Sequence, residues 1–338
     1  MRQDVHTVLP YLRKQSSSNG TVTAEKEKRD RREKTGERTM LSEVVRDIRV
    51  NWKISDDKRD EGLTTPDDIV RFDNISYGPY GDANLLDIYH QKKVTKPQKT
   101  IISIHGGGWV YGSKEQYQFY GMRLAQRGFT FVNFNYRLAP EYKYPTALED
   151  INQVFTFIRD HAEEYAIDTN NIFVVGDSAG AQLATQYLII CTNPEYAERF
   201  SFTPSGIKVR AVGLNCGVYD TSDPQHTSPN EVFLEYTGTE ILEDTEEARS
   251  MREELDTLKY MTGDFPPAFV TSAVHDFILE NAQPMYEKLQ SLGIDSEVHI
   301  YGSKEKEEVG HVFHVNCRLP EADQCNDEEC AFFNRYVV

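Results

Sequence analysis

The segment Asn171-Ile-Phe-Val-Val-Gly-Asp-Ser-Ala-Gly180 decides the fold. After Asn171, residues 172–175 form a short apolar run typical of a buried strand, and the pattern from about 179 to 190 is typical of a helix. The GxSxG motif at 176–180 lies between them. Its two glycines permit the sharp turn of a nucleophile elbow, and the helix N-terminus that follows favours negative charge. The sequence therefore predicts a nucleophilic hydroxyl at Ser178.

A second glycine-rich motif, His105-Gly-Gly-Gly-Trp109, follows an apolar strand predicted at 100–104. Consecutive glycines allow backbone N–H groups to approach a ligand closely. Amides already aimed at the oxygen that becomes negative in a tetrahedral intermediate form an oxyanion hole. We expect His105 itself to support this loop rather than to react.

A serine hydroxyl needs a base, and the base needs an orienting acid. Where the serine lies on an elbow, the acid and then the histidine follow it along the chain. Asp276 follows a strand predicted at 268–274, and His311 lies in the loop after a strand predicted at 297–301. Both should reach the carboxyl edge of the sheet, where ligands bind in such folds. Other candidates stay open: Asp220, Asp264 or Glu280 as the acid, and His314 or His275 as the base.

Strand and helix patterns alternate along the chain from residue 69. Further strands are predicted at 69–72, 85–89, 129–134 and 209–214, and helices at 146–165, 280–292 and 327–336. The first two strands should form a hairpin. The remaining alternation indicates right-handed crossovers and a mostly parallel sheet flanked by helices, an α/β fold. Residues 217–263 contain no convincing strand, and we interpret them as a helical insertion.

Residues 1–39 differ in composition from the rest of the chain. The stretch 25–38 is almost wholly charged, so it cannot bury enough apolar surface to offset the entropy of ordering. Apolar residues then recur on one helical face after Met40: Leu41, Val44, Val45 and Ile48. We predict a flexible N-terminal extension over 1–39 and a single domain over 40–338.

Composition excludes several classes of partner. With 37 basic and 54 acidic residues, the net charge of −17 would repel a phosphate backbone, which argues against nucleic acid. No apolar run approaches the roughly 18 residues of a membrane span.

The first residues lack the apolar core of a signal peptide, and five cysteines in 338 residues do not resemble a disulfide framework. We expect a cytoplasmic protein, and a homodimer is compatible with these features.

No cofactor is expected. The chain contains neither the P-loop pattern nor GxGxxG. Cys317, Cys325 and Cys330 lie near His311 and His314, but they lack the short cysteine pair of structural zinc sites. We therefore expect no metal.

Three motifs together resemble a known family. HGGGWVYGS at 105–113, NYRLAPE at 135–141 and GDSAG at 176–180 are similar to the hormone-sensitive-lipase-like branch of the α/β-hydrolases, which includes many carboxylesterases. The resemblance implies an α/β-hydrolase fold with a small helical cap. By chain order alone, the cap elements would be about 40–66 and 217–263.

The resemblance also implies a role for each site residue. Ser178 would be the nucleophile, His311 the general base and acid, and Asp276 the orienting carboxylate. The oxyanion donors would be the backbone N–H groups of Gly107, Gly108 and Ala179.

Two positions depart from the family pattern. Ala181 follows the elbow where the family usually has glycine, and Val312 separates the histidine from Phe313 where the family usually has glycine. The second departure leaves the choice between His311 and His314 open.

The resemblance implies a serine carboxylesterase acting on a small-molecule ester through an acyl-enzyme. Its acyl groups would be short, from acetyl to about octanoyl. Two alternatives remain: an amide- or peptide-cleaving hydrolase on the same fold, and a non-catalytic homologue that binds small molecules. The retained Ser178, Asp276 and His311 argue against the second.

Overall fold

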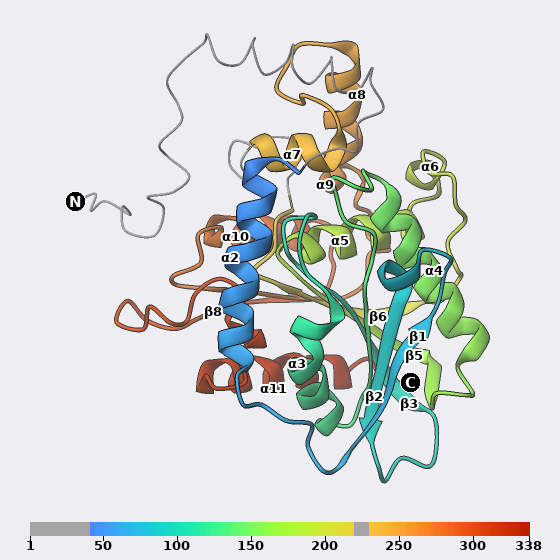
Figure 1. Cartoon of the computed structure of the whole chain (residues 1–338). Coiled ribbons are helices and arrows are strands. Elements are labelled where there is room, and N and C mark those ends of the chain that lie inside the picture. The colour runs from blue at the N-terminus through green and yellow to red at the C-terminus, as the bar shows by residue number, and fades with distance from the viewer. Residues whose placement is uncertain (1–40, 220–229) are drawn as a thin grey trace.

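Eight strands form one sheet at the centre of the computed structural model, which describes residues 41–219 and 230–338 (Figure 1). The spatial order is β1-β2-β4-β3-β5-β6-β7-β8. β2 pairs antiparallel with β1 and β4, and all the other pairs are parallel. The strands are β1 Ile69–Ser76, β2 Leu85–Gln91, β3 Gln98–Ile104, β4 Thr130–Phe134, β5 Ile167–Asp177, β6 Val209–Asn215, β7 Ala268–Ala273 and β8 Ser296–Tyr301. The predicted hairpin and mostly parallel sheet are confirmed.

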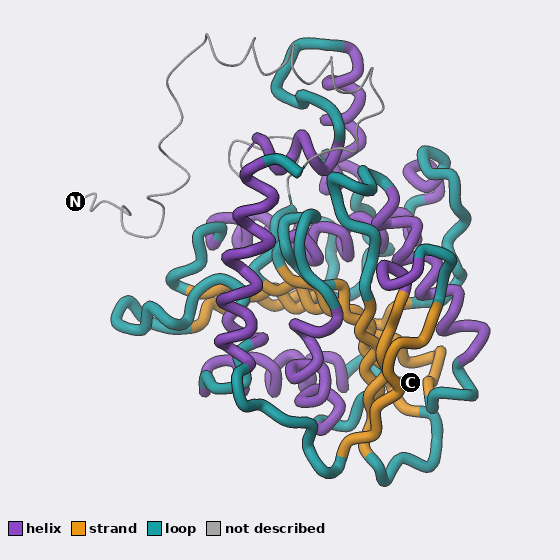
Figure 2. Tube along the Cα trace, viewed as in Figure 1, coloured by secondary structure: helices purple, strands orange, loops and turns teal. Residues whose placement is uncertain are grey.

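Helices cover both faces of the sheet (Figure 2). The helices are α2 Glu43–Asp60, α3 Lys114–Gln126, α4 Thr146–His161, α5 Ala179–Thr192, α6 Pro194–Ala197, α7 Asn230–Thr237, α8 Glu246–Leu255, α9 Thr257–Tyr260, α10 Ala282–Ser291 and α11 Pro320–Asn334. One apolar cluster packs α4, α5 and α10 on one face, and a second packs α3 and α11 on the other. Burial on both faces explains why apolar residues occupy consecutive positions in the central strands.

Several element boundaries differ from the sequence prediction. α3 was not predicted; Ser113 caps it by accepting a hydrogen bond from the N–H of Glu115. α11 begins at Pro320 rather than at 327, with proline in the first turn, where no helical N–H is required. β5 begins at Ile167 and α4 ends at His161, so the predicted helix over 146–165 was too long.

Helices follow at the carboxyl edge of the sheet, where the helical insertion was predicted. Between β6 and β7 the described residues form α7, α8 and α9 and contain no strand. α2 contacts both α3 and α7, so it joins this group to the body of the molecule (Figure 1). The predicted N-terminal extension over 1–39 lies outside the described residues.

Candidate active site

Ser178 stands at the turn between β5 and α5. Its backbone has φ 52° and ψ −121°, a strained conformation for a residue with a side chain. Its N–H donates to the carbonyl of Asn215 at 3.0 Å, which fixes the turn to the end of β6. A Cβ at Gly180 would lie 2.1 Å from the carbonyl oxygen of Ile104, so only glycine lets α5 pack this closely against β3. These contacts hold the hydroxyl above the sheet edge.

The glycine-rich loop after β3 lies beside this serine. Gly107 has φ 117°, and a Cβ there would lie 2.0 Å from the carbonyl oxygen of Tyr111. The N–H groups of Gly107, Gly108 and Ala179 make no hydrogen bond within the part of the chain that the structure describes. They are therefore available to a ligand oxygen, as an oxyanion hole requires.

Asp276 and His311 come from two loops that meet at the same edge. A bridge between His275 and Gly310 joins the loop after β7 to the loop after β8. His311 Nδ1 lies 2.8 Å from Asp276 Oδ1, and His311 Nε2 lies 3.0 Å from Ser178 Oγ. The structure thus brings together three side chains that are far apart in the sequence, in the geometry of an acid, a base and a nucleophile.

The environment of Asp276 favours its charged form. Burial alone would raise its pKa, but the hydrogen bond and charge of His311 and the N–H of Ile278 lower the pKa below its ordinary value. The hydroxyl of Ser272 also donates to this carboxylate at 2.7 Å. The carboxylate can therefore orient the imidazole and stabilise it when protonated.

The other candidate bases lie elsewhere. His314 is buried with its ring edge-on to Tyr120 at 5.3 Å, and burial lowers its pKa to about 3. His275 Nε2 lies 3.0 Å from the carbonyl oxygen of Ser303. Neither makes a described contact with Ser178.

The other candidate acids are not part of this arrangement either. Asp264 is exposed in the turn before β7, and Glu280 lies in the short helix Leu279–Asn281. Asp220 falls outside the described residues.

Val312, where the related family usually has glycine, lies in a strained backbone conformation. Val312 has φ 59°, in the left-handed region where glycine is favoured and a β-branched residue is strained. The backbone therefore keeps the conformation that a glycine would allow while carrying a valine. Ala181, the other departure, is fully buried in α5.

Asp177, which the sequence analysis did not single out, connects the elbow to the glycine-rich loop. Its carboxylate accepts a hydrogen bond from the Tyr117 hydroxyl at 2.7 Å and from the N–H of Gly106 at 3.2 Å. Burial raises its pKa to about 6. Adjacency to Ser178 was the only sequence signal for this role.

His105 and Trp109 hold the loop from its two ends. The His105 ring stacks on Tyr136 at 4.2 Å, and burial lowers its pKa to about 4, so it is neutral at pH 7. The indole N–H of Trp109 donates to Gln182 Oε1 at 3.0 Å, and the indole stacks on Tyr236 of α7 at 4.9 Å. Both side chains support the backbone.

One group of possible metal ligands occurs among the described residues. Cys216, Asp276 and His311 offer atoms that lie within 4.8 Å of one another. The two histidine nitrogens already face Asp276 and Ser178, so a metal bound to either nitrogen would replace one of these hydrogen bonds.

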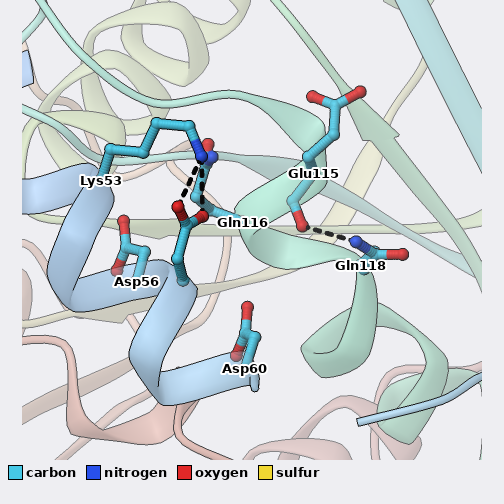
Figure 3. Close-up of a pocket in the computed structure, with 7 residues that line it drawn as sticks. Lys53, Asp56, Asp60, Glu115, Gln116 and Gln118 are labelled. Atoms are coloured by element: carbon cyan, nitrogen blue, oxygen red, sulfur yellow. Dashed lines mark hydrogen bonds and ion pairs between the residues drawn. The ribbon is translucent and has the colours of Figure 1, made fainter. Parts of the chain in front are cut away.

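A surface cavity of about 210 Å³ lies between α2 and α3 (Figure 3). Lys53 forms an ion pair with Asp57 at its rim. Its lining residues are Lys53, Asp56, Asp57, Asp60, Glu115, Gln116 and Gln118. Most of its ionisable groups are acidic, and no residue of the serine site lines it.

The sheet order, the serine elbow after β5 and the histidine loop after β8 define an α/β-hydrolase. The chain belongs to the BD-FAE family, whose model matches residues 86–289. This confirms the predicted membership of the α/β-hydrolases.

Curated relatives carry the names of esterases. The chain is 28% identical to Esterase LipC of Mycobacterium tuberculosis over 63% of this chain and 54% of that protein. It is 27% identical to a probable isoprenylcysteine alpha-carbonyl methylesterase of Arabidopsis thaliana over 67% of this chain and 49% of that protein. It is 28% identical to an acetyl esterase of Salmonella paratyphi B over 66% of this chain and 68% of that protein. The chain spans about half the length of the first two relatives.

Solved structures share the fold. Esterase B from Lactobacillus rhamnosis, in a complex with an inhibitor, has a TM-score of 0.77 at 20% identity, covering 87% of this chain and 97% of that one. A bacterial heroin esterase has a TM-score of 0.68 at 19% identity, covering 87% of this chain and 92% of that one. No helix in the described part of the chain has the length and apolar character needed to span a bilayer.

Proposed function

We propose that this chain is a serine carboxylesterase. The observation that carries the proposal is the path from Asp276 through His311 to Ser178, with distances of 2.8 and 3.0 Å. A general base must lie within hydrogen-bond reach of the proton that it removes, and these distances meet that requirement. The esterase names of the relatives support the same reaction class.

The reaction takes two steps. His311 accepts the Ser178 proton as Oγ bonds to the ester carbonyl carbon, and the carbonyl oxygen becomes negative. The N–H groups of Gly107, Gly108 and Ala179 stabilise this oxygen. The tetrahedral intermediate then collapses as the C–O bond to the alcohol breaks and His311 donates its proton to the alcohol. Water, activated by His311, repeats the sequence on the acyl-enzyme and releases the acid.

The proposed substrates are small esters with short acyl groups, from acetyl to about octanoyl. The acetyl esterase among the relatives supports the short end of this range. The mechanism requires no cofactor, because all of the proton transfers run through His311.

Hydrolysis of p-nitrophenyl acetate, butyrate and octanoate tests the proposal. Ser178→Ala should lower kcat by about 10⁴-fold or more, as removal of a triad serine does in other hydrolases. An organophosphate should label Ser178 in the unmodified chain. Ser291→Ala, at an exposed serine on α10, is the control and should behave like the unmodified chain.

Two results would contradict the proposal. Ser178→Ala retaining turnover within about tenfold would exclude the serine mechanism. Turnover of aminoacyl amides without turnover of any of the three esters would favour an amide-cleaving hydrolase instead.

A further inference from the structure

Phe277, which directly follows Asp276, is an exposed aromatic residue beside the site. Its side chain is 65% exposed, and its ring centroid lies 4.3 Å from that of His311 at an interplanar angle of 51°. Phenyl rings usually bury most of their area, so this exposure costs free energy in the absence of a ligand. The ring thus offers an exposed apolar surface packed against the imidazole.

The chemistry of the reaction defines what should lie beside that ring. His311 Nε2 faces Ser178 Oγ, and the same nitrogen must protonate the leaving oxygen. The leaving alcohol must therefore depart on the imidazole side of the site. The carbonyl oxygen points the other way, toward the amides of Gly107 and Gly108. Phe277 packs against the same imidazole that must protonate the leaving alcohol.

The oxyanion side is covered by different residues. A Cβ placed on Gly108 would lie 3.8 Å from the indole of Trp52 and 3.8 Å from Val232. Trp52 comes from α2 and Val232 from α7. The Trp52 ring meets Tyr111 edge-on at 5.8 Å, and the Tyr111 hydroxyl donates to Asp56. Apolar groups thus lie beside Gly108, while Phe277 alone contacts the His311 ring among the aromatic pairs of the described residues.

We propose that Phe277 forms a leaving-alcohol subsite that favours esters of alcohols carrying a flat apolar group, above all an aromatic ring. This inference rests on the proposed esterase function. An aromatic pair adds about 0.5–1.5 kcal/mol beyond the area it buries, which corresponds to about two- to tenfold in affinity. The hydroxyl groups of a polyhydroxylated alcohol would instead lose their hydrogen bonds to water against the phenyl ring and gain none there, so such an alcohol is disfavoured.

Acetate esters of three alcohols test the subsite without changing the acyl group: benzyl, cyclohexylmethyl and ethyl acetate. The alcohols differ little in acidity, so the chemical step is comparable among them. Phe277→Ala should lower kcat/KM about tenfold for benzyl acetate and only about twofold for ethyl acetate. Phe277→Leu, which remains apolar but loses the flat face, should bring the benzyl and cyclohexylmethyl rates together.

The control is Ile300→Ala, which removes an exposed apolar side chain from β8 and should leave all three rates unchanged. An equal loss for benzyl and ethyl acetate in Phe277→Ala would overturn the subsite, because the ring would then only position His311. Equal rates for benzyl and cyclohexylmethyl acetate in the unmodified chain would overturn the preference for a flat group.

A binding measurement separates the subsite from the proposed function. Saturation-transfer NMR should show benzyl alcohol bound to Ser178→Ala, and about tenfold more weakly to Ser178→Ala combined with Phe277→Ala. Absence of ester turnover in the unmodified chain, with this difference preserved, would contradict the esterase proposal alone. Equal binding of benzyl alcohol to both variants would contradict the subsite whether or not esters are hydrolysed.

Discussion

The aim of the His311 ring depends on the backbone on both sides of it. Gly310, which precedes His311 in the chain, forms a bridge with His275. Val312, which follows His311, has φ 59°. A β-branched residue in the left-handed region costs about 1–2 kcal/mol, so the surrounding structure must impose this conformation. The bridge and the packing of Phe313 at only 3% exposure supply that constraint. The loop therefore presents one particular histidine to the serine.

The two neighbouring histidines should respond oppositely to substitution. His311→Ala should lower kcat about as severely as Ser178→Ala, because it removes the only imidazole within reach of the serine among the described residues. His314→Ala should lower the free energy of unfolding by about 2–3 kcal/mol through lost packing against Tyr120, yet retain kcat within about tenfold. Kinetics and urea unfolding of both variants provide the measurement.

The double variant His311→Ala with Ser178→Ala should be no slower than either single variant, since the groups act as a unit. The reverse ranking, with His314→Ala inactive and His311→Ala active, would move the proposed base to His314.

The sequence predicted those residues whose function leaves a local pattern. Ser178 and the amides of the glycine-rich loop lie in motifs where each glycine has a steric reason. Asp177 lies inside the GxSxG motif at a position that the motif leaves open, and Phe277 lies in no motif. The bond from Asp177 to Tyr117 spans 60 residues and depends on the register of β3 against β5, which no local pattern encodes.

At the level of elements, α11 places a carboxyl group beneath the sheet. Glu329 is 1% exposed, and its Oε1 accepts a hydrogen bond from the Asn215 side chain at 2.9 Å. Its Oε2 has no hydrogen-bond partner within the described residues. The carbonyl of the same Asn215 accepts from the N–H of Ser178. Asn215 thus links the buried carboxyl of Glu329 to the backbone of Ser178.

Glu329 should make stability fall as pH rises. Burial raises its pKa from 4.5 to about 7, so between these values the folded chain holds a proton that the unfolded chain has released. The stabilising contribution is present below pH 4.5 and is lost as pH rises to about 7, a difference of about 3 kcal/mol. Glu329→Gln should therefore match the unmodified chain at pH 4.5 and exceed its free energy of unfolding at pH 8, as measured by urea unfolding.

Glu195→Gln, at an exposed position on α6, is the control and should leave the pH profile of stability unchanged. A pH profile of Glu329→Gln that parallels the unmodified chain would show that folding does not raise the pKa of Glu329.

Elements with strong periodicity were predicted, and those with mixed patterns were missed or misplaced. All eight strands were anticipated because each contains a short run rich in apolar residues. α3 was missed because Lys114 and Glu115 open it and its tyrosines interrupt the aliphatic stripe. Tyr117 and Tyr120 bury one face of α3 against the sheet, and the sequence of α3 alone does not indicate this contact.

At the level of the whole molecule, charged side chains fasten α2 to the body. The Arg49 guanidinium donates to both oxygens of Glu141, at 2.8 and 2.7 Å, and to the carbonyls of Val110 at 2.8 Å and Ala139 at 2.9 Å. Near the other end of α2, Arg59 donates to the carbonyl of Gln116 at 2.6 Å. The predicted apolar stripe contributes as well, since Val45 is fully buried. The sequence could indicate the stripe but not the surface that it meets, because that surface is assembled from distant loops.

The last prediction concerns two shortened chains. A chain that starts at Met40 should melt and hydrolyse esters like the full chain, because the charged composition of 1–39 offers little surface for a core. A chain that starts at Thr65 loses α2, and with it Trp52 over Gly108 and the Arg49 bond to Val110. It should keep its sheet, as judged by circular dichroism, but lose at least about tenfold in kcat/KM, because the glycine-rich loop and the substrate lose one wall.

Arg49→Gln in the full chain separates the contribution of the Arg49 side chain from the contribution of the whole helix α2. It removes the ion pair with Glu141 and the hydrogen bonds to the carbonyls of Val110 and Ala139 but keeps Trp52 in the chain, so its loss of kcat/KM should be smaller than that of the chain starting at Thr65. An ion pair at the surface is worth at most about 1 kcal/mol, so the part of the loss that comes from the ion pair should stay below about fivefold. Equal ester turnover in the full chain and in the chain starting at Thr65 would show that the sheet and its loops bind the ester without α2. In that case the residues over Gly108 would have to be sought in α7, where Val232 already lies 3.8 Å from the position of a Gly108 Cβ.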